Sequence, residues 1–219
     1  MTILTQIALP VATHAAPQDM SLLDLIFKGG FVMIPIFLLS VLGVYIFIEK
    51  YFYIRKLGKV DRKYILDLMG NVEREKIESA IQLSQHNGTS IGRIFATGLG
   101  HLGKPIKEIE DSIESAANLE VARMEKNISY LGIIAGIAPM LGFVGTISGV
   151  IKIFYSISLT DNISIGIIAG GLYQKMVCSG AGLIVGILAY SFYHYLQMMI
   201  DRFSLNLQDS VFEFINKIR

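Results

Sequence analysis

The sequence has little charge and almost no cysteine. Only 17% of its 219 residues are Asp, Glu, Lys or Arg, whereas 53% are hydrophobic. Soluble domains carry about 25% charged residues, so an ordinary soluble enzyme is not expected. The single cysteine, Cys178, can form neither an internal disulfide nor a cysteine metal cluster. Redox chemistry at a cysteine pair and zinc chemistry are therefore excluded.

A strong basic excess is also missing. The formal net charge is +1, so the chain has no basic domain that would neutralise nucleic-acid phosphates. The motifs of a phosphate-binding loop and of HExxH do not occur either. With no nucleophile paired to a base, we predict no catalytic residue, no cofactor and no metal site. An intramembrane enzyme is the least favoured hypothesis.

What the chain has instead is three long windows without charge. They cover residues 29–48, 127–151 and 162–200, and Lys175 is the one interruption. Each window can cross a bilayer as a helix, which takes about 20 apolar residues. The windows lack the strict alternation of strands, and three spans cannot close a barrel. The sequence therefore predicts an all-α integral membrane protein with three transmembrane helices.

The basic residues lie mostly on one side of these windows. Of the 19 Lys and Arg, 13 lie between the first two windows and three more in the C-terminal tail. Cytoplasmic segments carry such an excess, so both regions are predicted to be cytoplasmic. The predicted boundaries are 1–27 for an external N-terminal segment, 28–49 for the first transmembrane helix, 50–126 for a cytoplasmic helical region, 127–153 for the second transmembrane helix, 154–163 for an external loop, 164–198 for the third transmembrane helix and 199–219 for a cytoplasmic C-terminal helix.

Two of the predicted helices extend far into the cytoplasm. Apolar residues recur every three or four positions from Ile106 to Leu131, and Pro105 suits the first turn of a helix. A continuous helix from Pro105 to Ile153 would be about 73 Å long, far more than the roughly 30 Å of hydrocarbon. The same spacing continues from Ile200 to the end of the chain. These stripes indicate packing of helix on helix.

The second and third windows are rich in small residues. The predicted helix-packing positions are Pro139, Gly142, Gly145, Gly149, Gly182 and Gly186. Glycines four residues apart let neighbouring helix backbones approach closely. Pro139 also frees the carbonyl of Ala135, which in lipid requires protein or water as a substitute partner. Three spans leave these faces with too few neighbours in one chain, so we expect like subunits to pack there.

Two hydroxyls stand among these small residues, Thr146 and Ser179. Each either bonds its own backbone carbonyl one turn back or lines a hydrated path. The windows contain no Asp or Glu, and we expect Lys175 to extend to the headgroups and His194 to lie at the interface. A proton path normally uses carboxylates or histidines. The membrane windows therefore offer hydroxyl groups and no carboxylate to such a path.

The second and third windows also carry the motifs of a known family. Residues 138–146 read APMLGFVGT and residues 179–183 read SGAGL. Together they closely resemble the MotA/TolQ/ExbB proton channel family. Residues 29–35, GGFVMIP, and the basic exit at residues 49–56 are similar to the family's first span. Three spans and a short chain are most similar to the ExbB or TolQ branch, since MotA-type stators have four spans.

The resemblance implies a homo-oligomeric ring, typically pentameric, in a bacterial inner membrane with the N-terminus periplasmic and the C-terminus cytoplasmic. The ring encloses an ExbD-like or TolR-like dimer whose single spans supply a membrane aspartate. Thr146 matches the family's pore threonine. Ser179 stands where the family usually has a second threonine, and Gln174 stands where many members carry glutamate. These three residues are the predicted lining of the proton pathway. Gln174 cannot titrate, so the resemblance gives this subunit no pore carboxylate of its own.

The implied function is that of an ExbB-like subunit of a motor driven by the proton-motive force. Such a motor energises a TonB-like protein for import across the outer membrane. A TolQ-like subunit, which acts on a TolA-like protein in envelope maintenance, is the alternative within the family. A membrane scaffold that assembles partners without conducting protons is the alternative from another class. Membrane lipids are expected partners in every case.

Overall fold

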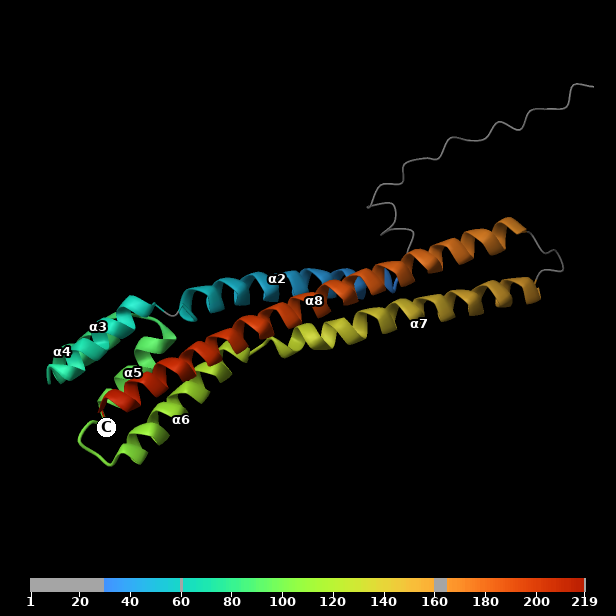
Figure 1. Ribbon diagram of the computed structural model, residues 1–219. Helices are drawn as coiled ribbons and strands as arrows, with labels where there is room; N and C mark the ends of the chain where they lie inside the picture. The colour runs from blue at the N-terminus through green and yellow to red at the C-terminus, as the bar shows by residue number, and fades with distance from the viewer. Residues whose placement is uncertain (1–29, 60, 160–164, 219) are drawn as a thin grey trace, which may run out of the picture.

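The computed structural model describes residues 30–59, 61–159 and 165–218, and the regular secondary structure of this part of the chain is all α-helix (Figure 1). Its helices are α2 (Met33–Leu57), α3 (Arg62–Glu73), α4 (Ile77–His86), α5 (Ser90–Leu99), α6 (Ile106–Glu125), α7 (Ser129–Leu159) and α8 (Ile165–Ile218). The predicted N-terminal segment 1–27 and the second half of the predicted loop 154–163 lie outside the described residues. The first half of that loop is helical, because α7 continues to Leu159.

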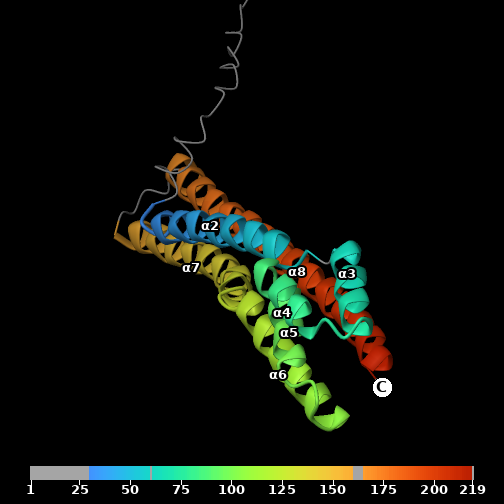
Figure 2. The same ribbon diagram turned by 90° about the vertical axis from the view of Figure 1, so that its left-hand side faces the viewer.

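Three helices in the described residues are long and apolar enough to cross a membrane, which confirms the predicted fold class. α2, α7 and α8 lie side by side, and α7 runs antiparallel to α8 (Figures 1 and 2). In their most apolar windows only 28%, 28% and 22% of the residues are buried. The remaining apolar faces require lipid or further protein chains around them.

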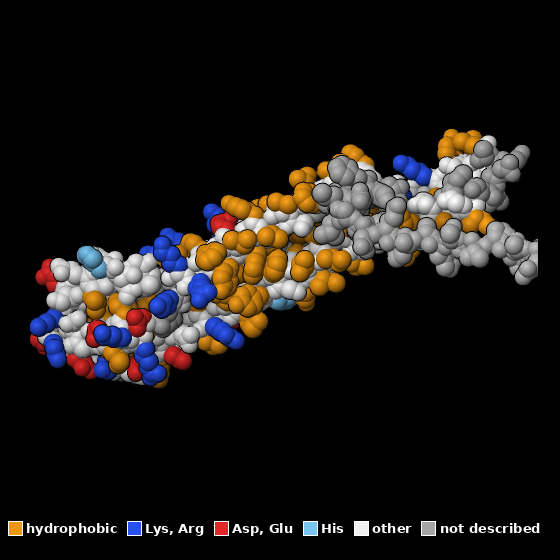
Figure 3. All heavy atoms as spheres, turned by 90° about the horizontal axis from the view of Figure 1, so that it is seen from above, with side chains coloured by type: hydrophobic (Ala, Val, Ile, Leu, Met, Phe, Trp, Pro, Cys, Tyr) orange, Lys and Arg blue, Asp and Glu red, His pale blue; other side chains and the backbone are white. Residues whose placement is uncertain are grey.

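Most of the charged residues that the structure describes gather at one end of the molecule. Figure 3 shows Lys, Arg, Asp and Glu over the end formed by α3–α6, and hydrophobic side chains over the middle. α2 ends between these regions with Arg55 and Lys56 in its last turn, where basic side chains favour the negative end of the helix dipole. Gly58 follows, and its N–H donates to the carbonyl of Ile54 at 2.7 Å.

The prediction of one continuous helix from Pro105 to Ile153 is wrong. α6 ends at Glu125 and α7 begins at Ser129. Asn127 has φ 70°, in the left-handed region that Asn tolerates better than most non-glycine residues. The apolar stripe continues across the break, so periodicity alone does not reveal it. In contrast, α8 continues unbroken to Ile218, a length of about 81 Å.

The end formed by α3–α6 has a core of large side chains. Phe95 of α5 meets Phe214 of α8 edge to face at 5.2 Å between ring centroids, and both are fully buried. Side-chain caps begin α3 and α5: Asp61 accepts from the N–H of Lys63, and Thr89 accepts from the N–H of Gly92. The C-terminal part of α8 thus belongs to a small helical core, while its first part belongs to the apolar bundle.

Candidate functional site in the α7–α8 contact

The APMLGFVGT segment of α7 packs directly on the SGAGL segment of α8. A Cβ added to Gly142 would lie 3.1 Å from the Cα of Ser179, and one added to Gly182 would lie 2.5 Å from the carbonyl oxygen of Ala138. These neighbours are backbone atoms, which cannot swing aside as a side chain can. The two helices therefore touch backbone to backbone, as small residues allow in membranes.

Pro139 belongs to the same contact. Its ring lies against Gly186, where an added Cβ would come 2.5 Å from the proline Cγ. The carbonyl of Ala135, which Pro139 deprives of its helical hydrogen bond, faces the same glycine at 3.1 Å from that Cβ position. Protein rather than lipid therefore covers this carbonyl.

Gly145 and Gly149 also face α8 of their own chain. A Cβ on Gly145 would lie 2.8 Å from the sulfur of Cys178, and one on Gly149 would overlap the methylene groups of Lys175. The expectation that like subunits supply the neighbours of these glycines is therefore wrong. The antiparallel pairing of α7 and α8 already fills these faces.

Thr146 lies beside this contact, one residue after Gly145. Its Oγ1 donates to the carbonyl of Phe143 at 2.6 Å, so its proton is used locally. The oxygen can still accept a hydrogen bond from water or from a protonated partner. The Thr146 hydroxyl therefore donates its proton within its own helix, as the first of the two alternatives predicted. Its oxygen can still accept a hydrogen bond in a hydrated path.

Ser179 lies at nearly the same depth on α8. Its backbone meets Gly142, and its neighbour Cys178 meets Gly145, so Thr146 and Ser179 are separated by about one helical turn along the bundle. Both residues are partly exposed. The side chain of Gln174, the third predicted lining residue, lies outside the described part of the structure.

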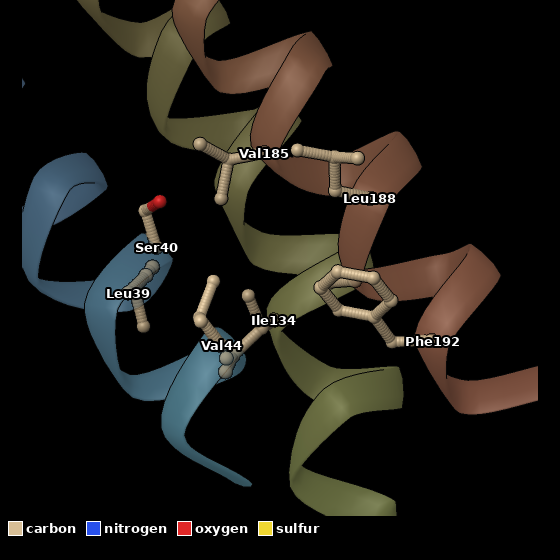
Figure 4. Close-up of a pocket in the computed structure, with 9 residues that line it drawn as sticks. Leu39, Ser40, Val44, Ile134, Val185, Leu188 and Phe192 are labelled. Atoms are coloured by element: carbon tan, nitrogen blue, oxygen red, sulfur yellow. The ribbon is translucent and has the colours of Figure 1, made fainter. Parts of the chain in front are cut away.

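The junction of α2 with α7 and α8 offers no ligand site. Figure 4 shows the side chains of Leu39, Val44, Ile134 and Phe192 around a pit of about 20 Å³. That volume holds about one water molecule, which needs two or more polar partners to stay. The labelled lining is apolar apart from the Ser40 hydroxyl, so the pit is a packing defect between helices.

Lys175 has a setting that the sequence did not reveal. Its side chain crosses Gly149 of α7 and lines a cleft of about 380 Å³ together with Lys152. The prediction that Lys175 extends to the headgroups considered this residue alone. Because the two lysines are 23 positions apart in the sequence, only the pairing of α7 with α8 places them in one cleft.

A buried ion cluster ties α5 to α6 at the charged end. The Glu120 carboxylate, 5% exposed, accepts hydrogen bonds from Arg93 at 3.1 and 2.5 Å and from Arg123 at 2.5 Å. Burial by itself raises the pKa of Glu120, but these bonds outweigh it and hold the pKa below the ordinary value. Sequence reasoning missed the cluster. The helical spacing of Glu120 and Arg123 was visible, but Arg93 joins them only through the fold.

Comparison with known proteins places these helices in a family. The model of the MotA/TolQ/ExbB proton channel family matches residues 86–209, which include α7, the α7–α8 contact and most of α8. A biopolymer transport protein ExbB homologue of Methanothermobacter thermautotrophicus is 27% identical over 187 residues, 83% of this chain and 64% of that protein. The chain therefore covers somewhat less than two thirds of that relative.

Two further relatives carry the names of both branches. The biopolymer transport protein ExbB of Salmonella typhimurium is 27% identical over 86 residues, 39% of this chain and 35% of that protein. The Tol-Pal system protein TolQ of Haemophilus influenzae is 23% identical over 109 residues, 50% of this chain and 48% of that protein.

Proposed function

Because the chain belongs to the MotA/TolQ/ExbB proton channel family, we propose that it is the ExbB-like subunit of a motor driven by the proton-motive force. In this proposal the motor lies in a bacterial inner membrane and energises a TonB-like protein for outer-membrane import. The family and its relatives support the coarser role of a membrane motor subunit. The match of longer extent to an ExbB homologue favours the ExbB branch over a TolQ-like role in envelope maintenance.

The observation that carries the proposal is the α7–α8 contact itself. The motif residues pack backbone to backbone, and the hydroxyls of Thr146 and Ser179 lie within about one turn of each other beside it. No Asp or Glu occurs in the described residues between 127 and 200. The titrating carboxylate is therefore assigned to an ExbD-like or TolR-like partner with a single span. The two hydroxyls solvate that carboxylate, or hold water beside it, as it alternates between charged and neutral forms.

A ring of like subunits, typically five, would enclose that partner. The exposed apolar side chains of α7 support this part of the proposal, because Phe143, Ile147 and Phe154 find no cover within the described chain. In the proposed topology α3–α6 are cytoplasmic and the N-terminus is periplasmic, as the basic residues indicate. Labelling of a cysteine introduced at Asn87 from the cytoplasmic side only would support this orientation. Cys178 is buried and gives little background.

Proton uptake into vesicles tests the proposal. The chain is reconstituted with its single-span partner, and uptake is compared with that of Thr146→Val combined with Ser179→Ala. We expect intact assembly and a large loss of uptake in this double variant. Ser191→Ala is the matched control, because Ser191 is exposed on α8 and bonds its own helix at 2.8 Å. Full uptake in the double variant would refute the role of the hydroxyls, and no uptake with the native chain would favour the scaffold hypothesis.

A further inference from the structure

Lys152 of α7 and Lys175 of α8 line a single cleft at the end of the bundle opposite α3–α6. The cleft measures about 380 Å³ and also contains the hydroxyl-bearing Ser148 and Ser156 and the chain at residues 30–32, just before α2. Figure 3 shows basic side chains at this end, far from the other charged residues. Two cations therefore share one polar recess in an apolar surface.

Two glycines shape this recess. Lys175 lies across Gly149, where any side chain would collide with the lysine methylenes. On the other helix, Ile153 lies against Gly171, where an added Cβ would come 2.7 Å from the Ile153 side chain. The aliphatic part of Lys175 is thus packed on α7, which leaves its ammonium group for a ligand.

Neither lysine has an acidic partner among the described residues. The ion pairs of this part of the chain are Arg93–Glu120, Arg123–Glu120, Lys104–Glu108 and Lys217–Glu73, all at the opposite end. Between residues 127 and 200 the described chain contains no carboxylate. Asp161, in the connection between α7 and α8, lies outside the described residues. Two ammonium groups close to hydrocarbon favour a bound anion.

The depth of the cleft identifies the kind of anion. From Val32, which lines the cleft, to Lys50 is a helical rise of about 27 Å, close to the roughly 30 Å of hydrocarbon. Lys50, Arg55 and Lys56 mark the other membrane surface. The cleft therefore lies at the headgroup level of the leaflet away from α3–α6. Phe31, which is 84% exposed, borders the cleft. The exposed apolar side chains of α2 continue from it along the helix.

We propose that this cleft binds the phosphate of an anionic phospholipid. The phosphate oxygens accept hydrogen bonds from the ammonium groups of Lys152 and Lys175, and the acyl chains lie along Phe31 and the exposed side of α2. A phosphate offers several acceptor oxygens to two ammonium groups, and its depth in the leaflet matches that of the cleft. The site does not depend on proton conduction or on the partner of the motor, so it can fail without the proposed function failing.

Native mass spectrometry of the purified full-length protein tests this site. Equal amounts of phosphatidylglycerol and phosphatidylcholine are added, and the lipids retained are counted. We expect preferential retention of phosphatidylglycerol, reduced several-fold by Lys152→Gln with Lys175→Gln and preserved by Lys152→Arg with Lys175→Arg. The matched control is Lys76→Gln with Lys107→Gln, which removes the same charge from exposed residues at the opposite end and leaves retention unchanged.

A second variant separates the geometry of the cleft from its charge. Gly149→Ala keeps both lysines but displaces the Lys175 side chain, so it should also lower the retention of phosphatidylglycerol. Unchanged retention in the double glutamine variant would overturn the proposal. Complete displacement of the lipid by millimolar inorganic phosphate would replace it with a site for free anions. Loss of a co-purified single-span partner with lipid retention unchanged would assign the cleft to a partner carboxylate.

Discussion

The two halves of α8 pack by opposite means. In the apolar bundle, α8 touches α7 through positions without side chains, such as Gly182 against the backbone of Ala138 and Gly142. At the charged end, α8 contributes Phe214 to a core of large buried side chains. Water drives burial of apolar area at that end. Lipid is as apolar as the helices, so in the bundle only close approach of the backbones gives an advantage.

The largest effect is expected from Gly182→Leu. The new side chain would meet the Ala138 carbonyl and the backbone of Gly142, neither of which can move without separating the helices. We expect loss of the folded protein, measured as loss of the monodisperse peak in size-exclusion chromatography. Gly180→Leu is the matched control, because nothing lies within 4 Å of its Cβ position. Equal behaviour of the two variants would contradict backbone-to-backbone packing.

The next effect concerns the core at the other end of α8. Phe214→Ala removes a fully buried ring and should lower the free energy of unfolding of that end by about 3–5 kcal/mol. Urea unfolding, followed by hydrogen exchange in peptides of α5 and α6, measures it. Phe212→Ala is the control, because Phe212 is 71% exposed. We expect hydrogen exchange in the α7–α8 bundle to stay unchanged. Faster exchange there would show that the bundle and the core at the charged end unfold together.

A smaller, pH-dependent effect is expected from Glu120→Gln. The pKa of Glu120 is lowered on folding, so its ionised form stabilises the fold fully above the ordinary value of 4.5. This contribution is lost as the pH falls from there through the folded pKa. We expect a loss of about 1 kcal/mol at pH 7, since solvent around the half-exposed arginines screens the ion pairs.

The measurement for Glu120 is the urea midpoint at pH 7 and at pH 4. Stability of the native chain should fall more between these values than that of the glutamine variant. Glu114→Gln, exposed on the same helix, provides the control. A pH dependence that is identical in the native chain and in Glu120→Gln would assign the acid sensitivity to other groups.

The smallest effect is expected from the loss of one local hydrogen bond, either in the apolar bundle or at the charged end of the molecule. Thr146 donates to Phe143 in the bundle at 2.6 Å, and Thr97 donates to Arg93 at the charged end at 3.0 Å. Each valine substitution should change the free energy of unfolding by less than about 1 kcal/mol, because only a local bond is lost. Thermal unfolding measures this change. Only Thr146→Val should also reduce proton uptake, and a similar reduction in Thr97→Val would point to a general defect.

Much of the membrane architecture could be predicted from where the charged residues lie along the sequence. The charge-free windows predicted three spans, since a charged side chain is costly in hydrocarbon and its place in the chain is visible in the sequence. The break between α6 and α7 was not predicted, because Asn127 adopts its left-handed conformation within an uninterrupted apolar pattern. Periodicity shows which side of a helix is apolar and does not show whether its backbone continues.

The candidate site, too, could be predicted only in part from the sequence. Its residues, among them Thr146, Ser179 and the glycines of α7 and α8, were recognisable from their types and spacing. Which face meets which partner was decided only by the antiparallel pairing of α7 with α8, which placed Lys175 over Gly149 and in one cleft with Lys152. Arg93 reached Glu120 through the packing of α5 on α6. Sequence alone determined what can lie in the membrane, because solvation is a property of each residue, whereas contacts between distant residues depend on how the helices pack.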